Sequence, residues 1–317
     1  MRKLFCAAAL AAFACAAAAQ ETTLSAVLFV PKNTTFGEIF VRFVEHVNAE
    51  GKGLVQIRLI GGPDAIPTFE QGNALKNGVV DMASVAPTFY TNLCPECDAQ
   101  ILAPLPTPKL KKTAFWQALD KDTVQKVNAH LLTAYADGVE FHIWTSKPLP
   151  NGSFKGMRLR TTPNYAPFFE ALGVSQVTTA PGEVLTALER GVVDGYGWPG
   201  IGMFDLGWGP HTHYRIDPGF YNVVVNILVN ESKWRGLRED QRAFLNRMGD
   251  WLETENVRWV AERKSADDKK IKEAGIQVVN MGPNHRKMAY DAYWAALAKR
   301  APEPIKELHA LSDKLGR

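Results

Sequence analysis

The chain has 317 residues, of which 46% are hydrophobic, and 36 Lys and Arg against 33 Asp and Glu give it a formal net charge of +3. A charge this small creates no strong field, so nucleic acids and anionic membrane surfaces are poor candidates for partners. The length exceeds what one hydrophobic core usually organises, which predicts two lobes.

The first 20 residues have the composition of a secretory signal peptide. Arg2 and Lys3 precede an apolar run that ends at Ala19, with small residues before Gln20. That run is too short to span a bilayer, and no other run approaches the roughly 18 apolar residues that a membrane helix needs. We therefore expect a periplasmic mature chain that is not embedded in the membrane.

Two of the four cysteines, Cys6 and Cys15, fall in the signal peptide. The other two, Cys94 and Cys97, stand in the sequence CPEC, which predicts a short disulfide in an oxidising compartment. A redox role is the alternative, but a loop that contains Pro95 gives it little support. No second ligand pair is present for zinc, so we expect no metal and no cofactor.

The mature chain begins with the pattern of a β-α-β-α-β unit and a parallel sheet. Strands are predicted at residues 22–30 and 54–60, a helix at residues 67–76, and a third strand in the VVD segment that ends at Asp81. The helix after the first strand has apolar residues at helical spacing, namely Phe36, Ile39, Phe40, Phe43, Val44 and Val47.

The next elements are a helical region at residues 108–132 and the strand VEFHIWT. Residues 146–155, rich in Pro, Gly and Ser, are predicted to cross from the first lobe to the second. Residues 220–229 predict a long strand shared between the lobes. Residues 237–275 predict a helix of more than about 50 Å, which would bridge both lobes, and a last strand and two amphipathic helices close the chain.

Residues 156–199 predict one compact α/β unit. GMRLR alternates like a half-buried strand and ends on Arg160, and the short helix APFFEALG is closed by Gly173. In open α/β sheets, ligands bind at the carboxyl ends of strands, and anions bind near helix N-termini. A guanidinium matches a carboxylate with two parallel hydrogen bonds. We interpret Arg160 as the anchor of a small organic acid; a solvated arginine paired with a surface acid is the alternative.

One sequence device occurs twice. Residues 74–81 read ALKNGVVD and residues 187–194 read ALERGVVD, and each is followed by a loop with proline, ASVAP and GYGWP. The repeat indicates two pseudo-equivalent lobes that face a shared cleft, with a chance match as the alternative.

These segments together resemble the solute-binding proteins of tripartite ATP-independent periplasmic (TRAP) transporters, over nearly the whole mature chain. The strand with Arg160, the FFEALG helix and the GEVLTALERGVVDG and GGPDAIPTFEQGNALKNGVVDMA runs carry the resemblance. It implies a two-lobed α/β periplasmic binding protein, in which each lobe is a mostly parallel sheet flanked by helices and a long helix and a shared strand bridge the lobes. We assign residues 21–144 and about 226–262 to lobe one, and residues 145–225 and about 263–317 to lobe two.

The resemblance also implies residues that face the ligand. After Asp-Gly the family usually has Gln-Glu-Asn-Pro, whereas this chain has YGWP, so Trp198 stands where an asparagine often touches the solute. An alignment on Thr145-Ser146 brings His142 to a ligand-side position with Trp144 on the same strand face. The alternatives are a satisfied, partly buried histidine for His142, core packing for Trp144 and hinge packing for Trp198. The remaining candidates are Ala86, Pro87 and Phe89 in lobe one and Tyr165, Phe220 and Tyr221 around the crossing.

Phe89 falls near a position where some relatives carry a charge, and Trp198 replaces a polar residue. Both departures favour a monocarboxylate with an apolar or ring-bearing body. The function implied is capture of a small carboxylate between the lobes, by a monomer that delivers it to the membrane subunits of a TRAP transporter.

An exported enzyme that acts on an organic acid, with His142 or His211 as base, is the alternative function. The sequence GYGWPG matches G-x-G-x-x-G, but Pro199 makes a poor helix start after it. A phosphate-binding loop, a nucleophile elbow and an H-E-x-x-H motif do not occur in the sequence. We therefore expect a binding protein and not an enzyme.

Overall fold

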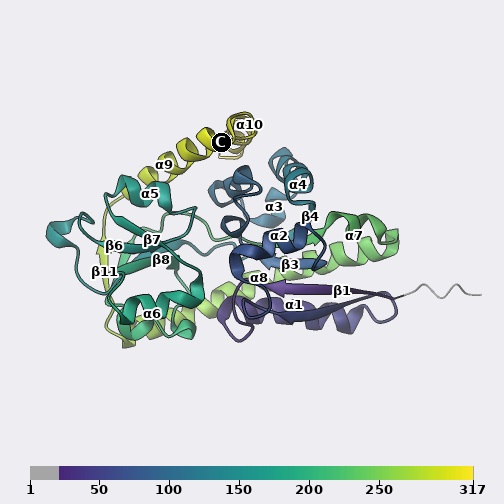
Figure 1. Cartoon of the computed structure of the whole chain (residues 1–317), viewed down its shortest axis with the longest axis horizontal. Helices are drawn as coiled ribbons and strands as arrows, with labels where there is room; N and C mark the ends of the chain where they lie inside the picture. Colours follow the sequence, from purple (N-terminus) through teal and green to yellow (C-terminus); the bar gives the residue numbers. More distant parts are fainter. Residues whose placement is uncertain (1–20, 317) are drawn as a thin grey trace, which may run out of the picture.

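The computed structural model describes residues 21–316, so the predicted signal peptide lies outside the described residues. The described chain folds into two α/β lobes that lie next to each other, with one sheet in each (Figure 1). The predicted fold class is confirmed.

Lobe one is built on a five-stranded sheet in the order β2-β1-β3-β10-β4. Strands β1, β2 and β3 are parallel, and β10 is antiparallel to both of its neighbours, β3 and β4. The strands are β1 (Thr22–Leu28), β2 (Val55–Gly61), β3 (Met82–Val85), β4 (Ala129–Tyr135) and β10 (Val225–Asn230).

Helices of lobe one cover this sheet with the faces that the sequence predicts. In α1 all six of the apolar residues at helical spacing are buried. The helices are α1 (Thr35–Glu50), α2 (Gln71–Lys76), α3 (Thr107–Leu110), α4 (Ala114–Val127) and α7 (Glu231–Gly236), with 3₁₀ turns η1 (Thr68–Glu70), η2 (Pro87–Phe89) and η3 (Pro95–Leu102).

Strand β4 corrects the predicted helix at residues 108–132. Helix α4 ends at Val127 because Asn128 takes the left-handed conformation, with φ of 53°. The following residues, His130 included, pair with β10 instead of continuing the helix. Their apolar run fits a buried strand as well as a helix, which is why the pattern was ambiguous.

Lobe two is built on a six-stranded sheet in the order β11-β9-β5-β8-β6-β7. Strand β5 is antiparallel to β8 and β9, and the other neighbours are parallel. The elements are β5 (Phe141–Thr145), β6 (Arg158–Thr161), β7 (Ser175–Thr178), β8 (Gly195–Pro199), β9 (Tyr214–Asp217), β11 (Gln277–Asn280), α5 (Ala166–Ala171) and α6 (Val184–Glu189), with 3₁₀ turns η4 (Pro150–Gly152), η5 (Pro181–Glu183), η6 (Phe204–Leu206) and η7 (Gly209–His211).

The chain crosses between the lobes at residues 136–140 and again at residues 218–224. The two crossing segments pair, because Val223 N–H donates to the Val139 carbonyl and Phe141 N–H to the Tyr221 carbonyl, both at 2.9 Å. The predicted shared strand is therefore a crossing segment that continues into β10.

The first crossing lies earlier than the expected residues 146–155, and β5 belongs to the sheet of lobe two although it was assigned to lobe one up to residue 144. The physical reason is backbone conformation: Ala136 and Gly138 have φ of 75° and 87°, so the chain turns out of lobe one directly after β4.

Two of the three C-terminal helices, α8 and α9, connect the lobes (Figure 1). Helix α8 (Glu239–Glu273) has 35 residues, about 50 Å at 1.5 Å per residue. It packs on α1 and β4, and at its other end the carboxylate of Asp267 accepts the N–H of Gly202 in lobe two at 2.5 Å. The predicted bridging helix is thus confirmed.

Helix α9 (Asn284–Arg300) packs on α5 in lobe two and on η3 in lobe one, and α10 (Pro302–Leu315) packs on η3 and α4. The last helix therefore lies on lobe one, although the sequence assigned it to lobe two. The pattern of α10 identified its buried face but could not identify which lobe covers that face.

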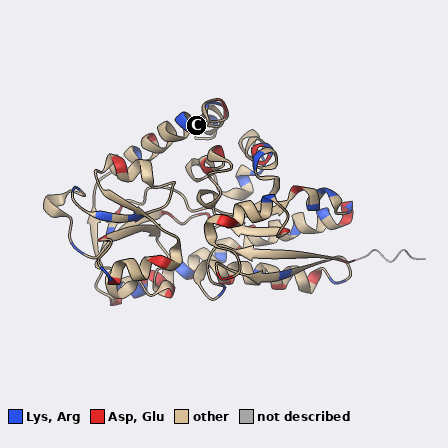
Figure 2. Cartoon of the chain, viewed as in Figure 1, with Lys and Arg blue, Asp and Glu red and all other residues tan. Residues whose placement is uncertain are grey.

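Charged residues of both signs are spread over the helices of both lobes (Figure 2). Of the helices in residues 21–316, none combines the length and the apolar character needed to cross a membrane.

Candidate functional site

The candidate site is a cavity between the two lobes, which are closed around it. The Phe36 ring of lobe one meets the Trp198 ring of lobe two edge to face at 6.1 Å between centroids. Beside it, Asn164 N–H of lobe two donates to Thr88 Oγ1 of lobe one at 3.3 Å. The enclosed space is about 30 Å³, which is room for about two water molecules.

The cavity lining is mostly apolar and aromatic, and among the described residues that form it only Arg160 is charged. Lobe one, lobe two and the second crossing segment all contribute. The lining residues are Phe29, Phe36, Ala86, Thr88, Phe89, Phe141, Arg160, Thr162, Tyr165, Trp198, Pro199, Val223, Val224 and Val225.

Arg160 reaches this cavity from β6, which is the strand that the GMRLR pattern predicts. The side chain is fully buried. Its Nε and Nη2 donate to the carbonyl of Thr179 at 3.1 and 2.8 Å, and its Nη1 donates to the carbonyl of Gly197 at 3.2 Å. A guanidinium has five N–H donors, so two remain for a ligand, which is the number that a bidentate carboxylate accepts.

The charge of Arg160 has no anionic partner in the structure. No Asp or Glu among residues 21–316 lies within ion-pair distance of it. Burial lowers the pKa of Arg160 to about 10, and the group therefore stays protonated at neutral pH. A buried and unpaired cation is costly unless something compensates it.

Trp198 forms a flat wall next to this cation. The guanidinium carbon of Arg160 lies 5.9 Å from the centroid of the Trp198 ring. The indole N–H donates to the Ile201 carbonyl at 3.1 Å, so it is not free for a ligand. In lobe one Phe89 also lines the cavity, and its ring packs on those of Phe29 and Phe69, at 5.5 and 5.2 Å between centroids.

Five of the ten residues that the sequence indicated line the cavity together: Arg160, Trp198, Tyr165, Ala86 and Phe89. Pro87 does not, because it starts the 3₁₀ turn that presents Thr88 and Phe89. Phe220 lies behind the cavity, where it packs on Tyr165 and Phe141 at 5.6 and 6.1 Å between centroids.

Tyr221 is further away, under α9, and donates to the Ala289 carbonyl at 2.9 Å.

His142 and Trp144 correct the choice of strand face in β5. Side chains alternate along a strand, and it is Phe141 that faces the cavity. His142 turns to the other side, where Nδ1 lies 2.9 Å from the carboxylate of Asp217. Trp144 is buried and donates to the Trp198 carbonyl at 3.1 Å, so it supports the wall without forming it.

The sequence missed several lining residues. Phe29 directly follows the first strand, Phe36 lies in the first turn of α1, and Thr162 directly follows β6. A rule that the residues after each strand's carboxyl end face the cleft would have found Phe29 and Thr162. The valines of the crossing segment carry no such signal, because their pattern is that of any buried strand.

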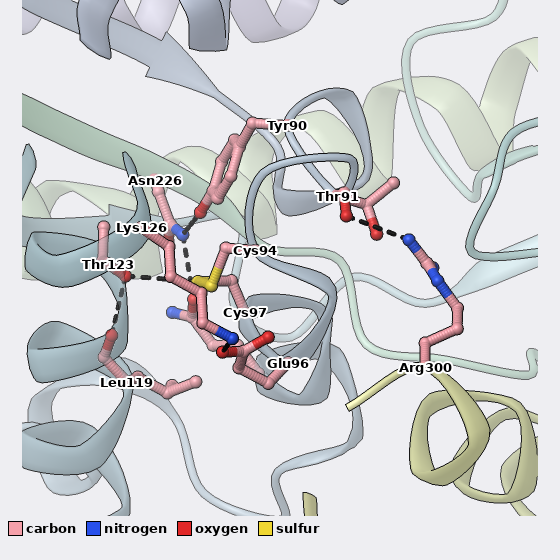
Figure 3. Close-up of a disulfide and its surroundings, with 11 residues drawn as sticks. Tyr90, Thr91, Cys94, Glu96, Cys97, Leu119, Thr123, Lys126, Asn226 and Arg300 are labelled. Carbon is pink, nitrogen blue, oxygen red and sulfur yellow. Dashed lines mark hydrogen bonds and ion pairs between the residues drawn. A yellow bond between two sulfur atoms is a disulfide. The ribbon is translucent and has the colours of Figure 1, made fainter. Parts of the chain in front are cut away.

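The predicted disulfide between Cys94 and Cys97 is present, at the start of η3 in lobe one (Figure 3). Both cysteines are buried, and Cys97 Sγ lies 3.4 Å from Thr123 Oγ1 on α4. The bridge therefore belongs to the core of lobe one and not to the cavity. Within residues 21–316 no cluster of three or more His, Cys, Asp or Glu is arranged to hold a metal ion.

Solved structures show the same fold. A TRAP periplasmic solute binding protein from Desulfovibrio salexigens with bound orotic acid has a TM-score of 0.82 at 18% identity, over 92% of this chain and 98% of that one. One from Rhodoferax ferrireducens with bound malonate has a TM-score of 0.80 at 15% identity, over 92% and 98%. One from Polaromonas sp. bound to D-erythronate has 0.77 at 21%, over 92% and 99%.

Among curated proteins, the monocarboxylate 2-oxoacid-binding periplasmic protein of Nostoc sp. is 23% identical over 204 residues. The match covers 61% of this chain and 56% of that relative, a little over half of its length.

The family model for bacterial extracellular solute-binding protein, family 7, matches residues 26–301, which is most of the chain. The resemblance seen in the sequence is therefore confirmed, and the enzyme alternative is set aside because the matched family is one of binding proteins. The chain belongs to the bacterial extracellular solute-binding proteins of family 7.

Proposed function

We propose that this protein binds a small monocarboxylate with an apolar body in the cavity between its lobes, and delivers it to the membrane subunits of a TRAP transporter. It does so in the periplasm and as a monomer. The solute-binding role follows from the family; the ligand class, the residues, the compartment and the monomeric state are the proposal.

Arg160 carries this proposal. It is a fully buried cation without an anionic partner among residues 21–316, and two of its five N–H donors are unused. A bound carboxylate would supply the missing negative charge. A charge-assisted hydrogen bond contributes roughly 1.5–3 kcal/mol, and the low dielectric of the cavity strengthens it.

The rest of the lining indicates the body of the ligand. Phe29, Phe36, Phe89 and Trp198 offer rings, and the polar groups next to them are hydroxyls such as those of Thr88 and Thr162. A second carboxylate on the ligand would find no second cation, and its desolvation would oppose binding. The name of the Nostoc relative, which specifies monocarboxylates, supports the same class.

Closure of the lobes couples binding to delivery. The carboxylate would contact lobe two through Arg160, while the body would contact Phe89 and Phe36 of lobe one. Because the ligand touches both lobes only when they are closed, it lowers the free energy of the closed state relative to the open state. The cavity encloses about 30 Å³, so the side chains around it must spread to admit an acid.

The test is a thermal-shift and calorimetric screen of the mature protein against 2-oxo monocarboxylates, aromatic monocarboxylates, dicarboxylates and sugar acids. A ligand at about 100 times its Kd stabilises a protein by roughly 2.7 kcal/mol, which is easily detected. We expect the best ligands among the monocarboxylates.

The matched variants are Arg160→Ala and Arg158→Ala, which remove the same side chain from one strand. Arg158 is half exposed and pairs with Asp194, so its loss should leave affinity unchanged. Arg160→Ala should weaken binding at least about 100-fold, since two charge-assisted bonds are lost. Tight binding by Arg160→Ala, or no monocarboxylate ligand at all, would overturn the proposal.

A further inference from the structure

A second cavity, of about 210 Å³, lies in lobe one beside the crossing segments. A single water molecule needs about 10–15 Å³ of cavity volume. A cavity of about 210 Å³ therefore has room for a small organic molecule. Val224 lines both this cavity and the smaller one that contains Arg160. The second crossing segment thus stands between the two, and the larger cavity is separate from the proposed solute site.

Gln100 lines this cavity, and its amide carries a donor that no group of the described chain uses. Gln100 is 2% exposed, and its Oε1 accepts a hydrogen bond from Asn226 Nδ2 at 2.9 Å. Its Nε2 is buried and has no hydrogen-bond partner in the described chain. A buried donor left without an acceptor costs about 1–3 kcal/mol, so a ligand oxygen at this position would be stabilising.

Asp137 supplies an unpaired negative charge to the same cavity. Its Oδ2 accepts the N–H of Thr107 at 2.7 Å. No Lys, Arg or His among residues 21–316 lies within ion-pair distance of it. Burial raises the pKa of Asp137 to about 6, so the group is ionised at pH 7.5.

Part of the cavity wall is apolar and is formed by side chains such as Leu105, Leu110 and Val224, beside the polar Thr107 and Asn222. An inorganic cation would need more oxygen ligands than one carboxylate, and no cluster of three or more candidate ligands occurs within the described part of the chain. An organic ammonium group with a short apolar stem satisfies the carboxylate and the walls together.

We propose that this cavity is a second binding site, for a small primary ammonium compound that also carries a carbonyl or hydroxyl oxygen. The ammonium group pairs with Asp137, and the oxygen accepts the free N–H of Gln100. The site takes a cation where the solute cavity takes an anion, and it does not depend on the solute proposed above.

The probe is β-alaninamide, which has an ammonium group and a carboxamide oxygen, titrated into the mature protein at pH 7.5 by calorimetry and by ligand-observed NMR. Propionamide lacks the ammonium group and is the matched control ligand. We expect saturable binding of β-alaninamide with a Kd of about 1 mM or below, and binding of propionamide at least about tenfold weaker.

Asp137→Asn keeps an acceptor for the Thr107 N–H and removes the charge, and should weaken β-alaninamide binding by about tenfold to 100-fold. Gln100→Leu is a second variant, with an expected loss of about fivefold to tenfold. Asp291→Asn, on the exposed face of α9, is the matched control and should bind like the unmodified protein. Arg160→Ala should also bind the amine normally, which separates this site from the solute site.

Absence of saturable binding up to about ten times the expected Kd, or equal binding by the unmodified protein and Asp137→Asn, would overturn the proposal. Equal binding of propionamide would do so too, because it would show that the charge is not recognised.

Discussion

Asp81 in lobe one and Asp194 in lobe two occupy the same place in two copies of one turn. Each follows a left-handed glycine, Gly78 with φ of 71° and Gly191 with φ of 63°. Asp81 Oδ2 accepts the N–H of Ser25 on β1 at 2.8 Å, and Asp194 Oδ2 accepts the N–H of Arg158 on β6 at 2.9 Å.

Each of the two carboxylates also has a lysine partner: Lys233 lies 3.2 Å from Asp81 and Lys147 lies 2.9 Å from Asp194. The turn therefore ties a helix to the neighbouring parallel strand in both lobes. The VVD segment, predicted as a strand, is part of this turn. The strands start after it, at Met82 and Gly195.

The two lobes share this turn, but they differ in the residues that face the cavity. Lobe one contributes uncharged groups such as Phe36 and Phe89, whereas lobe two contributes Arg160. Buried charge has the opposite sign in lobe one, where Glu96 and Asp98 are fully buried in η3. The scaffold is therefore duplicated between the lobes, whereas the residues that would recognise the solute are not.

The largest expected effect comes from breaking the duplicated turn. Asp81→Ala and Asp194→Ala should each lower the free energy of unfolding by about 2 kcal/mol, because each removes an acceptor for a strand N–H and an ion-pair partner. Only Asp194→Ala should also weaken solute binding, by about tenfold. Asp194 accepts the backbone N–H of Arg158, two residues from Arg160, and therefore helps to position β6. Urea unfolding and calorimetry measure the two quantities.

Asp81→Asn and Asp194→Asn keep an acceptor and lose only the ion pair. Each should therefore destabilise the protein about half as much as the corresponding Ala variant. Equal loss of solute affinity in Asp81→Ala and Asp194→Ala would contradict the view that only lobe two positions the anchor.

Asp98, a buried acid of lobe one, should make the free energy of unfolding depend on pH by about 1.5 kcal/mol. Burial raises the pKa of Asp98 to about 6, although the nearby hydroxyls of Thr91 and Tyr293 and the charge of Arg300 oppose the rise. Arg300 is held nearby by the Thr91 carbonyl at 2.9 Å (Figure 3). The folded state therefore binds a proton more tightly than the unfolded state.

The contribution of Asp98 to stability is accordingly present below its unfolded pKa of about 4 and is lost as the pH rises to about 6. Asp98→Asn mimics the protonated form. Between pH 5 and pH 7.5, the unfolding free energy of the unmodified protein should fall relative to that of Asp98→Asn by about 1.5 kcal/mol. Asp313→Asn, exposed on α10, is the control, and a parallel pH dependence of Asp98→Asn and the unmodified protein would refute the assignment.

Much of the architecture was readable in the sequence because it rests on local patterns. The apolar spacing of α1, the strand that ends near Arg160 and the long run of α8 are all properties of neighbouring residues. Arg160 could be singled out because it ends a predicted strand, at the sheet edge where open α/β sheets bind ligands.

What the sequence did not contain was tertiary pairing. His142 and Phe141 are adjacent, and which of them faces the cavity depends on which side of β5 lobe one covers. The first crossing depends on a left-handed alanine, Ala136, a residue type that gives no sign of that conformation. The lobe that receives α10 is likewise decided by surfaces far away in the sequence.

The smallest expected effect concerns a contact that exists only between the lobes. Asp205 of lobe two accepts the N–H of Thr35 at 2.9 Å, in the first turn of α1 in lobe one, and it also accepts the Thr35 hydroxyl. The residue before the helix, Thr34, makes no capping hydrogen bond of its own. Closure therefore supplies the acceptor that this helix end lacks, and such a cap contributes about 1 kcal/mol.

Asp205→Ala should weaken solute binding about fivefold. The lost cap contributes about 1 kcal/mol, and 1.4 kcal/mol corresponds to a tenfold change in Kd. The contacts inside the cavity are unchanged. Asp205→Asn keeps the acceptor and should lose less. Calorimetry gives the affinity, and small-angle scattering with and without solute gives the fraction of closed molecules, which Asp205→Ala should lower at subsaturating solute. An unchanged affinity would mean that α1 finds another acceptor when the lobes separate. The difference between the lobes that matters for binding would then be confined to the residues that line the cavity.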